Sequence, residues 1–129
     1  MHEVDNMAHG DLKVDNFVIS DDFGLKLIDF AHSAKLTSSS RSRIGTPNYH
    51  APEVASGDWY SVEKADIFSL GAALFVIVFK DAPFSQNGCC DDEVYWESFP
   101  ADPDHFFARW ECFSEVDPAA LDLIAWCFD

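Results

Sequence analysis

A short polar stretch near the start of the chain, residues 9–16 (His-Gly-Asp-Leu-Lys-Val-Asp-Asn), carries side chains suited to phosphoryl transfer. Asp11 can accept a proton from an attacking hydroxyl, and Lys13 can neutralise charge on the phosphoryl group that moves. Asn16 and a second carboxylate, Asp29, can hold Mg²⁺ ions that bridge phosphate oxygens. Because such a transition state needs mainly positioning and compensating charge, these four side chains predict a phosphoryl-transfer centre.

The segment between Asn16 and Asp29 predicts a β-hairpin. Residues 17–20 and 25–28 are rich in apolar and β-branched side chains, and the Asp-Asp-Phe-Gly sequence between them is typical of a turn. A hairpin places its two ends side by side, so Asn16 and Asp29 are expected to lie close enough to share a metal centre. Asp22, in the turn, would lie at the hairpin tip and away from the metal.

Residues 9–16 resemble the catalytic loop of eukaryotic protein kinases, H-R-D-L-K-x-x-N, and Asp29-Phe30 resembles the start of the D-F-G motif that follows it. The resemblance implies structural roles for His9 and Phe30, whose rings would pack together. The same loop also resembles H-G-D-x-x-x-x-N of small-molecule phosphotransferases such as aminoglycoside and choline kinases. Gly10 fits that second family better.

A second motif favours the protein kinases. Residues 45–53, Gly-Thr-Pro-Asn-Tyr-His-Ala-Pro-Glu, are similar to G-T-P-x-Y-x-A-P-E, the substrate-docking segment of serine/threonine protein kinases, which small-molecule phosphotransferases lack. The resemblance implies that Thr46 hydrogen-bonds near Asp11 and Lys13 and so couples peptide docking to the catalytic loop. It gives Glu53 a structural role.

The resemblance therefore implies a serine/threonine protein kinase that transfers the γ-phosphoryl group of ATP to protein substrates, with ATP and Mg²⁺ as cofactors. Asp11 would be the catalytic base, and Lys13 would contact the phosphate. Asn16 and Asp29 would bind the nucleotide through Mg²⁺. Asp66, in a stretch similar to D-x-W-S-x-G, would support the catalytic loop by capping its backbone.

The elements that position these residues are expected to be mainly helical. The apolar run at 67–79 is too short to span a membrane and predicts a buried core helix. Short helices are expected at 93–96 and 105–110, and Asp-Pro opens a helix over 117–124. Residues 1–8 are interpreted as the end of a helix. The expected fold is α+β: a protein-kinase-like C-terminal lobe, mainly helical, with a small β-hairpin at the catalytic loop.

Composition narrows the class of partner. The 129 residues, 48% of them hydrophobic, are enough for one domain with a core. A net charge of −15 argues against nucleic-acid and anionic-membrane binding, because phosphate groups would be repelled. The four cysteines form no Cys-x-x-Cys pair, and no signal-peptide pattern is present, so an intracellular, cytoplasmic location is expected.

Residues 32–43 form a polar loop that matches the activation loop of the kinases in place and character. Its composition is equally compatible with a solvated, flexible loop. The candidate phosphorylation sites are Thr37, Ser38, Ser39, Ser40 and Ser42.

The chain departs from the kinase pattern at three points. The G-x-G-x-x-G loop and V-A-I-K lysine of the small lobe are missing, so residues 1–129 are interpreted as a partial kinase domain, inactive alone, whose N-lobe is expected from a longer parent chain. Gly10 replaces the arginine that receives an activation-loop phosphate, and Glu53 lacks its usual arginine partner. A non-catalytic, pseudokinase-like binding module stays an alternative, and a small-molecule phosphotransferase is a less favoured one.

Overall fold

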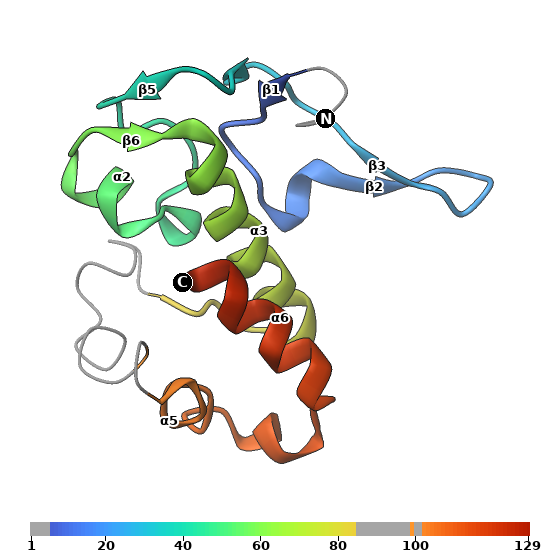
Figure 1. The fold of residues 1–129 in the computed structure, drawn as a ribbon. Helices are drawn as coiled ribbons and strands as arrows, with labels where there is room; N and C mark the ends of the chain where they lie inside the picture. Colours follow the sequence, from blue (N-terminus) through green and yellow to red (C-terminus); the bar gives the residue numbers. More distant parts are fainter. Residues whose placement is uncertain (1–5, 85–98, 100–101) are drawn as a thin grey trace.

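The computed structural model of the chain describes residues 6–84, 99 and 102–129 (Figure 1). The central element is the long helix α3 (Val62–Phe79), with helix α6 (Pro118–Phe128) packed along it. Short strands and helix α2 (Pro52–Ser56) lie around the N-terminal part of α3, and α5 (Pro103–Phe107) lies near its other end. This mixture of helices and small sheets agrees with the expected α+β class.

The buried side chains of helix α3 are mostly small or aromatic. Ala72 and Phe75 are fully buried, whereas Ile77 is 58% exposed, so the helix is not covered on every side. A Cβ atom on Gly71 would lie 2.6 Å from the Cβ of Cys127 on α6. Glycine at this position therefore permits the close approach of the two helices. No helix in the described part of the chain is long and apolar enough to cross a membrane.

Phenylalanine rings fill the space between α3, α5 and α6. The ring centroid of Phe75 lies 4.3 Å from that of Phe79 and 6.1 Å from that of Phe106, distances typical of favourable aromatic pairs. The core also includes Phe68, Phe84, Phe99, Phe107 and Phe128.

The helices after α3 agree with the sequence prediction in place but not at every boundary. Helix α6 has its N-cap at Asp117, whose side chain accepts a hydrogen bond from Ala119 N at 2.8 Å, and it runs four residues beyond the expected end. Helix α5 starts earlier than expected and ends at Phe107, because Asp102 caps it and proline suits the first turn. A 3₁₀ helix, η4 (Glu111–Glu115), follows it. The helix expected at 93–96 lies outside the described residues.

In the described part of the chain, six short strands form three antiparallel pairs. Strand β1 (Met7–Ala8) pairs with β4 (Ala34–Lys35), β2 (Phe17–Ile19) with β3 (Leu25–Leu27), and β5 (Ser39–Ser40) with β6 (Tyr60–Ser61). The interpretation of residues 1–8 as the end of a helix is wrong for Met7 and Ala8. Their backbone groups pair with those of β4, more than 25 residues later in the chain, and the local sequence gives no sign of this pairing.

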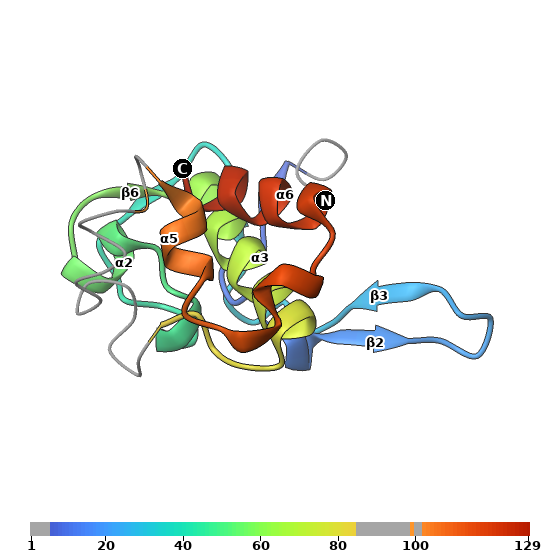
Figure 2. The same ribbon diagram turned by 90° about the horizontal axis from the view of Figure 1, so that it is seen from below.

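The hairpin β2–β3 has the two strands that the sequence predicts, with Phe17 opposite Leu27 and Ile19 opposite Leu25. Its turn is closed by a hydrogen bond from Ser20 N to Gly24 O at 2.9 Å. In both ribbon views the hairpin projects away from the body of the molecule (Figures 1 and 2). The base of the hairpin, rather than its tip, therefore adjoins the rest of the chain.

Candidate active site

The loop 9–16 is fixed to α3 by a buried carboxylate. Asp66, in the first turns of α3, is 2% exposed. One of its oxygens accepts a hydrogen bond from His9 N at 2.6 Å, and the other accepts one from Gly10 N at 2.8 Å. Asp66 thus satisfies two backbone N–H groups of the loop and links the loop to α3.

His9 is fully buried beneath the loop, and both of its ring nitrogens are engaged. Nδ1 accepts a hydrogen bond from Asp11 N at 3.2 Å, which requires the tautomer with the proton on Nε2. Nε2 can then donate to the carbonyl of Ile28, 3.0 Å away. The ring of Phe30 meets the His9 ring edge-on, with centroids 5.1 Å apart. With both nitrogens occupied, His9 holds the loop in shape and has no free nitrogen for proton transfer.

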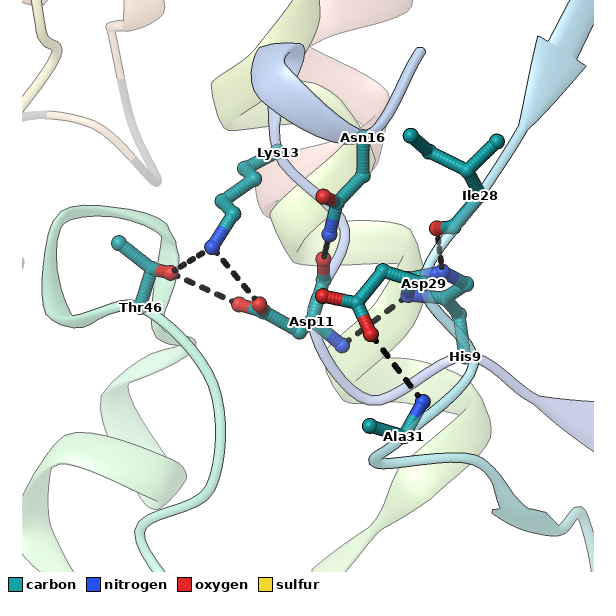
Figure 3. A network of polar contacts seen from close by, with 8 residues as sticks. All are labelled: His9, Asp11, Lys13, Asn16, Ile28, Asp29, Ala31 and Thr46. Atoms are coloured by element: carbon teal, nitrogen blue, oxygen red, sulfur yellow. Dashed lines mark hydrogen bonds and ion pairs between the residues drawn. The ribbon is translucent and has the colours of Figure 1, made fainter.

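Asp11, Lys13 and Thr46 form a closed triangle of polar contacts (Figure 3). Lys13 Nζ lies 2.8 Å from Asp11 Oδ2 and 3.0 Å from Thr46 Oγ1. The Thr46 hydroxyl donates to Asp11 Oδ1 at 2.8 Å. Thr46 immediately precedes the 3₁₀ helix η2 (Pro47–Tyr49), so the segment 45–53 meets the loop 9–16 at this triangle.

The triangle sets the charge states of its members. Burial opposes ionisation of Asp11, but the hydrogen bonds from Lys13 and Thr46 outweigh it and hold the pKa of Asp11 below its usual value. The hydrogen bond to Asp11 raises the pKa of Lys13. At neutral pH the site therefore contains an ionised carboxylate next to a protonated amine, with a hydroxyl shared between them.

A Thr46→Val variant tests this arrangement. It is expected to raise the folded-state pKa of Asp11 and to cost about 0.5–1.5 kcal/mol of stability at neutral pH, because one hydrogen bond to the carboxylate is lost. A lowered folded-state pKa means that the ionised Asp11 stabilises the fold above its unfolded pKa, near 3.9, and that this contribution is lost as the pH falls through the folded value. ¹³C NMR titration of the Asp11 carboxyl group measures the change.

Thr46→Ser is the matched control for that titration, because it keeps the hydroxyl and removes only a methyl group. Its titration curve should follow the wild type. An unchanged Asp11 midpoint in Thr46→Val would contradict the arrangement.

Asn16 and Asp29 lie next to each other at the base of the hairpin, where Ile28 N donates to Asn16 O at 2.9 Å (Figure 3). The Asn16 side chain is buried, and its Nδ2 donates to Asp11 O at 2.8 Å, so Oδ1 is the atom left to act as a ligand. Asp29 is exposed, and its backbone has the left-handed φ of 63°. Among the described residues, the hydrogen bond to its carboxylate is a long one of 3.4 Å, from Ala31 N.

These two oxygen donors fit Mg²⁺, which binds through one or two carboxylates or amide oxygens together with phosphate oxygens and water. Within residues 6–84, 99 and 102–129, no three His, Cys, Asp or Glu side chains gather closely enough to hold a metal ion. A Mg²⁺ ion at Asn16 and Asp29 would accordingly depend on oxygens of a bound phosphate.

Asp22 is exposed and lies in the turn of the hairpin, between Ser20 and Gly24. Its carboxylate accepts a hydrogen bond from the Ser20 hydroxyl and lies 3.4 Å from Gly24 N. These bonds lower the pKa of Asp22, the Ser20 bond most strongly. The carboxylate therefore stabilises the turn, as its sequence context suggests.

One hollow borders the site, and a second lies apart from it. A cavity of about 260 Å³ borders Asp11 and Thr46, below the range of about 300–1,000 Å³ typical of small-molecule sites. A wider hollow of about 750 Å³ lies between α2, α3 and α6, and the half-buried Glu53 lines it. No side chain in the described part of the chain pairs with the Glu53 carboxylate.

Sequence reasoning missed one residue that supports the segment 45–53. Ser69 Oγ on α3 donates to the carbonyl of Tyr49 at 2.7 Å and so ties the segment 45–53 to the central helix. The signal was visible, because Ser69 is a polar residue inside the otherwise apolar run at 67–79.

The chain is similar in sequence to known proteins over most of its length. The profile of the protein kinase domain family matches residues 1–129. The chain is 44% identical over 82 residues to CBL-interacting serine/threonine-protein kinase 24 of Arabidopsis thaliana, a match that covers 61% of the chain and 18% of the relative. It is 36% identical over 93 residues to testis-specific serine/threonine-protein kinase 1 of Homo sapiens, covering 67% of the chain and 25% of the relative. It is 38% identical over 86 residues to maternal embryonic leucine zipper kinase of Danio rerio, covering 64% and 13%. The chain therefore spans a quarter or less of the length of these relatives.

Proposed function

Because the chain belongs to the protein kinase domain family, we propose that it forms the C-terminal lobe of a serine/threonine protein kinase and supplies its catalytic and substrate-docking side. The observation that carries the proposal is the triangle of Asp11, Lys13 and Thr46. It joins a potential base, a cation and the peptide-docking segment in one contact. Small-molecule phosphotransferases lack a peptide-docking segment, so no such segment contacts their catalytic base.

The chemistry assigned to this chain follows from the charge states. Asp11 is ionised, and each of its oxygens has a second lone pair beyond the bonds from Lys13 and Thr46, so the carboxylate can accept the proton of a Ser or Thr hydroxyl. Lys13 is protonated and can move toward negative charge that develops beside Asp11. When bound, ATP supplies the phosphoryl group, and Mg²⁺, held by Asn16 and Asp29, offsets the charge of the phosphates.

Lys13, Asn16 and Asp29 would form only one side of a nucleotide site. The glycine-rich loop and the phosphate-binding lysine of protein kinases are absent from the 129 residues. We therefore expect little or no transfer of phosphate by the chain alone, and activity when it is joined to a nucleotide-binding lobe.

A chimeric protein tests the proposal. The 129 residues are fused behind the nucleotide-binding lobe of one of the three relatives, and transfer of the ATP γ-phosphoryl group is measured on a Ser/Thr peptide library and on a panel of small alcohols. The expected result is peptide phosphorylation that neither part shows separately. Phosphorylation of small alcohols instead of peptides would overturn the assignment of the substrate class.

The second candidate is a non-catalytic binding module, which the absence of the small-lobe motifs favours. It predicts that a well-folded chimera binds peptides yet transfers no phosphate. The same fusion therefore separates the two candidates, provided that circular dichroism shows a folded protein.

The two Asp-Phe dipeptides of the hairpin offer a matched pair of variants. In the chimera, Asp29→Asn is expected to raise the Mg²⁺ concentration for half-maximal activity by about 10- to 100-fold, the usual cost of disturbing a metal site. Asp22→Asn, at the hairpin tip, should leave it unchanged. Equal effects of the two changes, measured in Mg²⁺ titrations of peptide phosphorylation, would contradict the assignment of the metal ligand.

A further inference from the structure

The segment that leads to Thr46 is attached to the body of the molecule at several points. Its strand β5 pairs with β6, with Ser39 opposite Ser61 and Ser40 opposite Tyr60. The hydroxyl of the buried Tyr60 then donates to the carbonyl of Ser42 at 2.7 Å. These contacts place the chain against the start of α3 four residues before Thr46.

Two arginines of the same segment bind the C-terminal end of α2. Arg43 Nη2 donates to the carbonyl of Ser56 at 3.1 Å, and Arg41 Nε donates to the carbonyl of Gly57 at 3.4 Å. The Arg41 guanidinium also lies over the ring of Trp59, 5.9 Å from its centroid. Carbonyls at a helix end lack intrahelical partners, so a guanidinium there satisfies acceptors that the helix itself leaves open.

Gly57 makes room for this contact. Its backbone has a left-handed φ of 80°, and a Cβ atom there would lie 3.3 Å from Arg43 Nε. The Arg43 guanidinium thus packs against the α-carbon of Gly57 at the end of α2. A residue with a side chain would be strained in this backbone conformation and would crowd the guanidinium.

The cations that attach the segment lie on the segment itself. Position 10 is a glycine and supplies no cation to the segment. A side chain does not fit there, because Gly10 has a left-handed φ of 82° and a Cβ atom would lie 2.4 Å from the carbonyl oxygen of His32. Arg41 and Arg43 donate to neutral backbone carbonyls, so the attachment needs no modified side chain as an acceptor.

We propose that Arg43 and Tyr60 are positioning residues that hold residues 39–45 against the end of α2 and the start of α3, so that the Thr46 hydroxyl reaches Asp11 in the unphosphorylated chain. The attachment of residues 39–45 does not depend on the proposed kinase function, whereas its consequence for catalysis rests on that function. The proposal predicts that residues 39–46 are ordered before any of the candidate phosphorylation sites from Thr37 to Ser42 is phosphorylated.

Hydrogen–deuterium exchange of the unphosphorylated 129-residue chain tests the attachment. Arg43→Gln and Tyr60→Phe are each expected to speed exchange of the amides of residues 40–46 by about 5- to 10-fold, the effect of losing one hydrogen bond. Arg43→Lys keeps a cationic donor and should stay within about twofold of the wild type. Lys26→Gln, which removes a charge from the remote β3, is the control for net charge and should change nothing in this segment.

Titration of Asp11 by ¹³C NMR asks whether the attachment positions Thr46. Tyr60→Phe changes no charge, so a higher Asp11 midpoint in this variant reports a weakened Thr46 contact rather than a lost cation. We expect such a rise, and we expect Arg43→Lys to titrate like the wild type.

Two results would overturn the proposal. One is unchanged exchange of residues 40–46 in both Arg43→Gln and Tyr60→Phe. The other is faster exchange that extends equally over α3 and α6, since this would show general destabilisation instead of positioning. Neither measurement needs phosphoryl transfer, so an inactive chimera with the expected exchange would reject the proposed function and leave the positioning role intact.

Discussion

An Asp11→Asn variant of the chimeric kinase is expected to lose about 10²- to 10⁴-fold in kcat, the usual contribution of a general base. Asparagine has nearly the same shape as aspartate but cannot accept the proton of the substrate hydroxyl. The buried carboxylate of Asp11 is also the common acceptor for Lys13 and Thr46, so the variant removes charge from the centre of the triangle. Initial rates of peptide phosphorylation at saturating ATP measure the loss.

Asp15→Asn is the matched control for this experiment. Asp15 belongs to the same loop, in the 3₁₀ helix η1 (Val14–Asn16), but its side chain is exposed and outside the triangle. Its kcat should stay within about twofold of the wild type. If Asp11→Asn kept activity within tenfold of the wild type while folded, Asp11 would not be the base.

The second large effect is expected for stability. An Asp66→Ala variant should lower the free energy of unfolding by about 2–5 kcal/mol, because the backbone N–H groups of His9 and Gly10 lose their acceptor inside the protein. Urea unfolding of the 129-residue chain, followed by circular dichroism and tryptophan fluorescence, measures the change.

Glu63→Ala provides the comparison for Asp66. Glu63 lies on the same turn of α3 and carries the same charge, but its side chain is exposed, so the change should stay within about 0.5 kcal/mol. A loss below 1 kcal/mol in Asp66→Ala would show that the loop 9–16 does not depend on this carboxylate.

Where the determining contacts are local, the sequence was sufficient to predict the structure. The hairpin β2–β3 follows from two short apolar runs around a turn, and the start of α6 follows from the Asp117 cap. The apolar run at 67–79 predicted a core helix, and the structure extends it back to Val62. Each of these elements satisfies its own hydrogen bonds within a few residues, so its signal is complete in one stretch of sequence.

The contacts that bring the site together span long distances in the chain. His9 and Asp66 are 57 residues apart, and Asp11 and Thr46 are 35 apart. Motif resemblance led to the expectation that these pairs would meet, but spacing alone could not show it. The distances within these pairs depend on α3, which binds both the loop 9–16 and the segment 45–53. The direction of the pKa shift at Asp11 depends on the same distances.

The sequence by itself determined which chemistry is available: a carboxylate, a cation, and two oxygen donors at the ends of a hairpin. The tertiary structure decided which contacts position these groups. Asp66 binds the backbone of the loop 9–16, Ser69 binds the segment 45–53, and Arg43 binds the end of α2. It also assigned Met7 and Ala8 to a strand, because their backbone groups pair with residues that lie far along the chain. Side-chain types are a property of the sequence, whereas the partners of a backbone carbonyl or a buried N–H group exist only after the chain has folded.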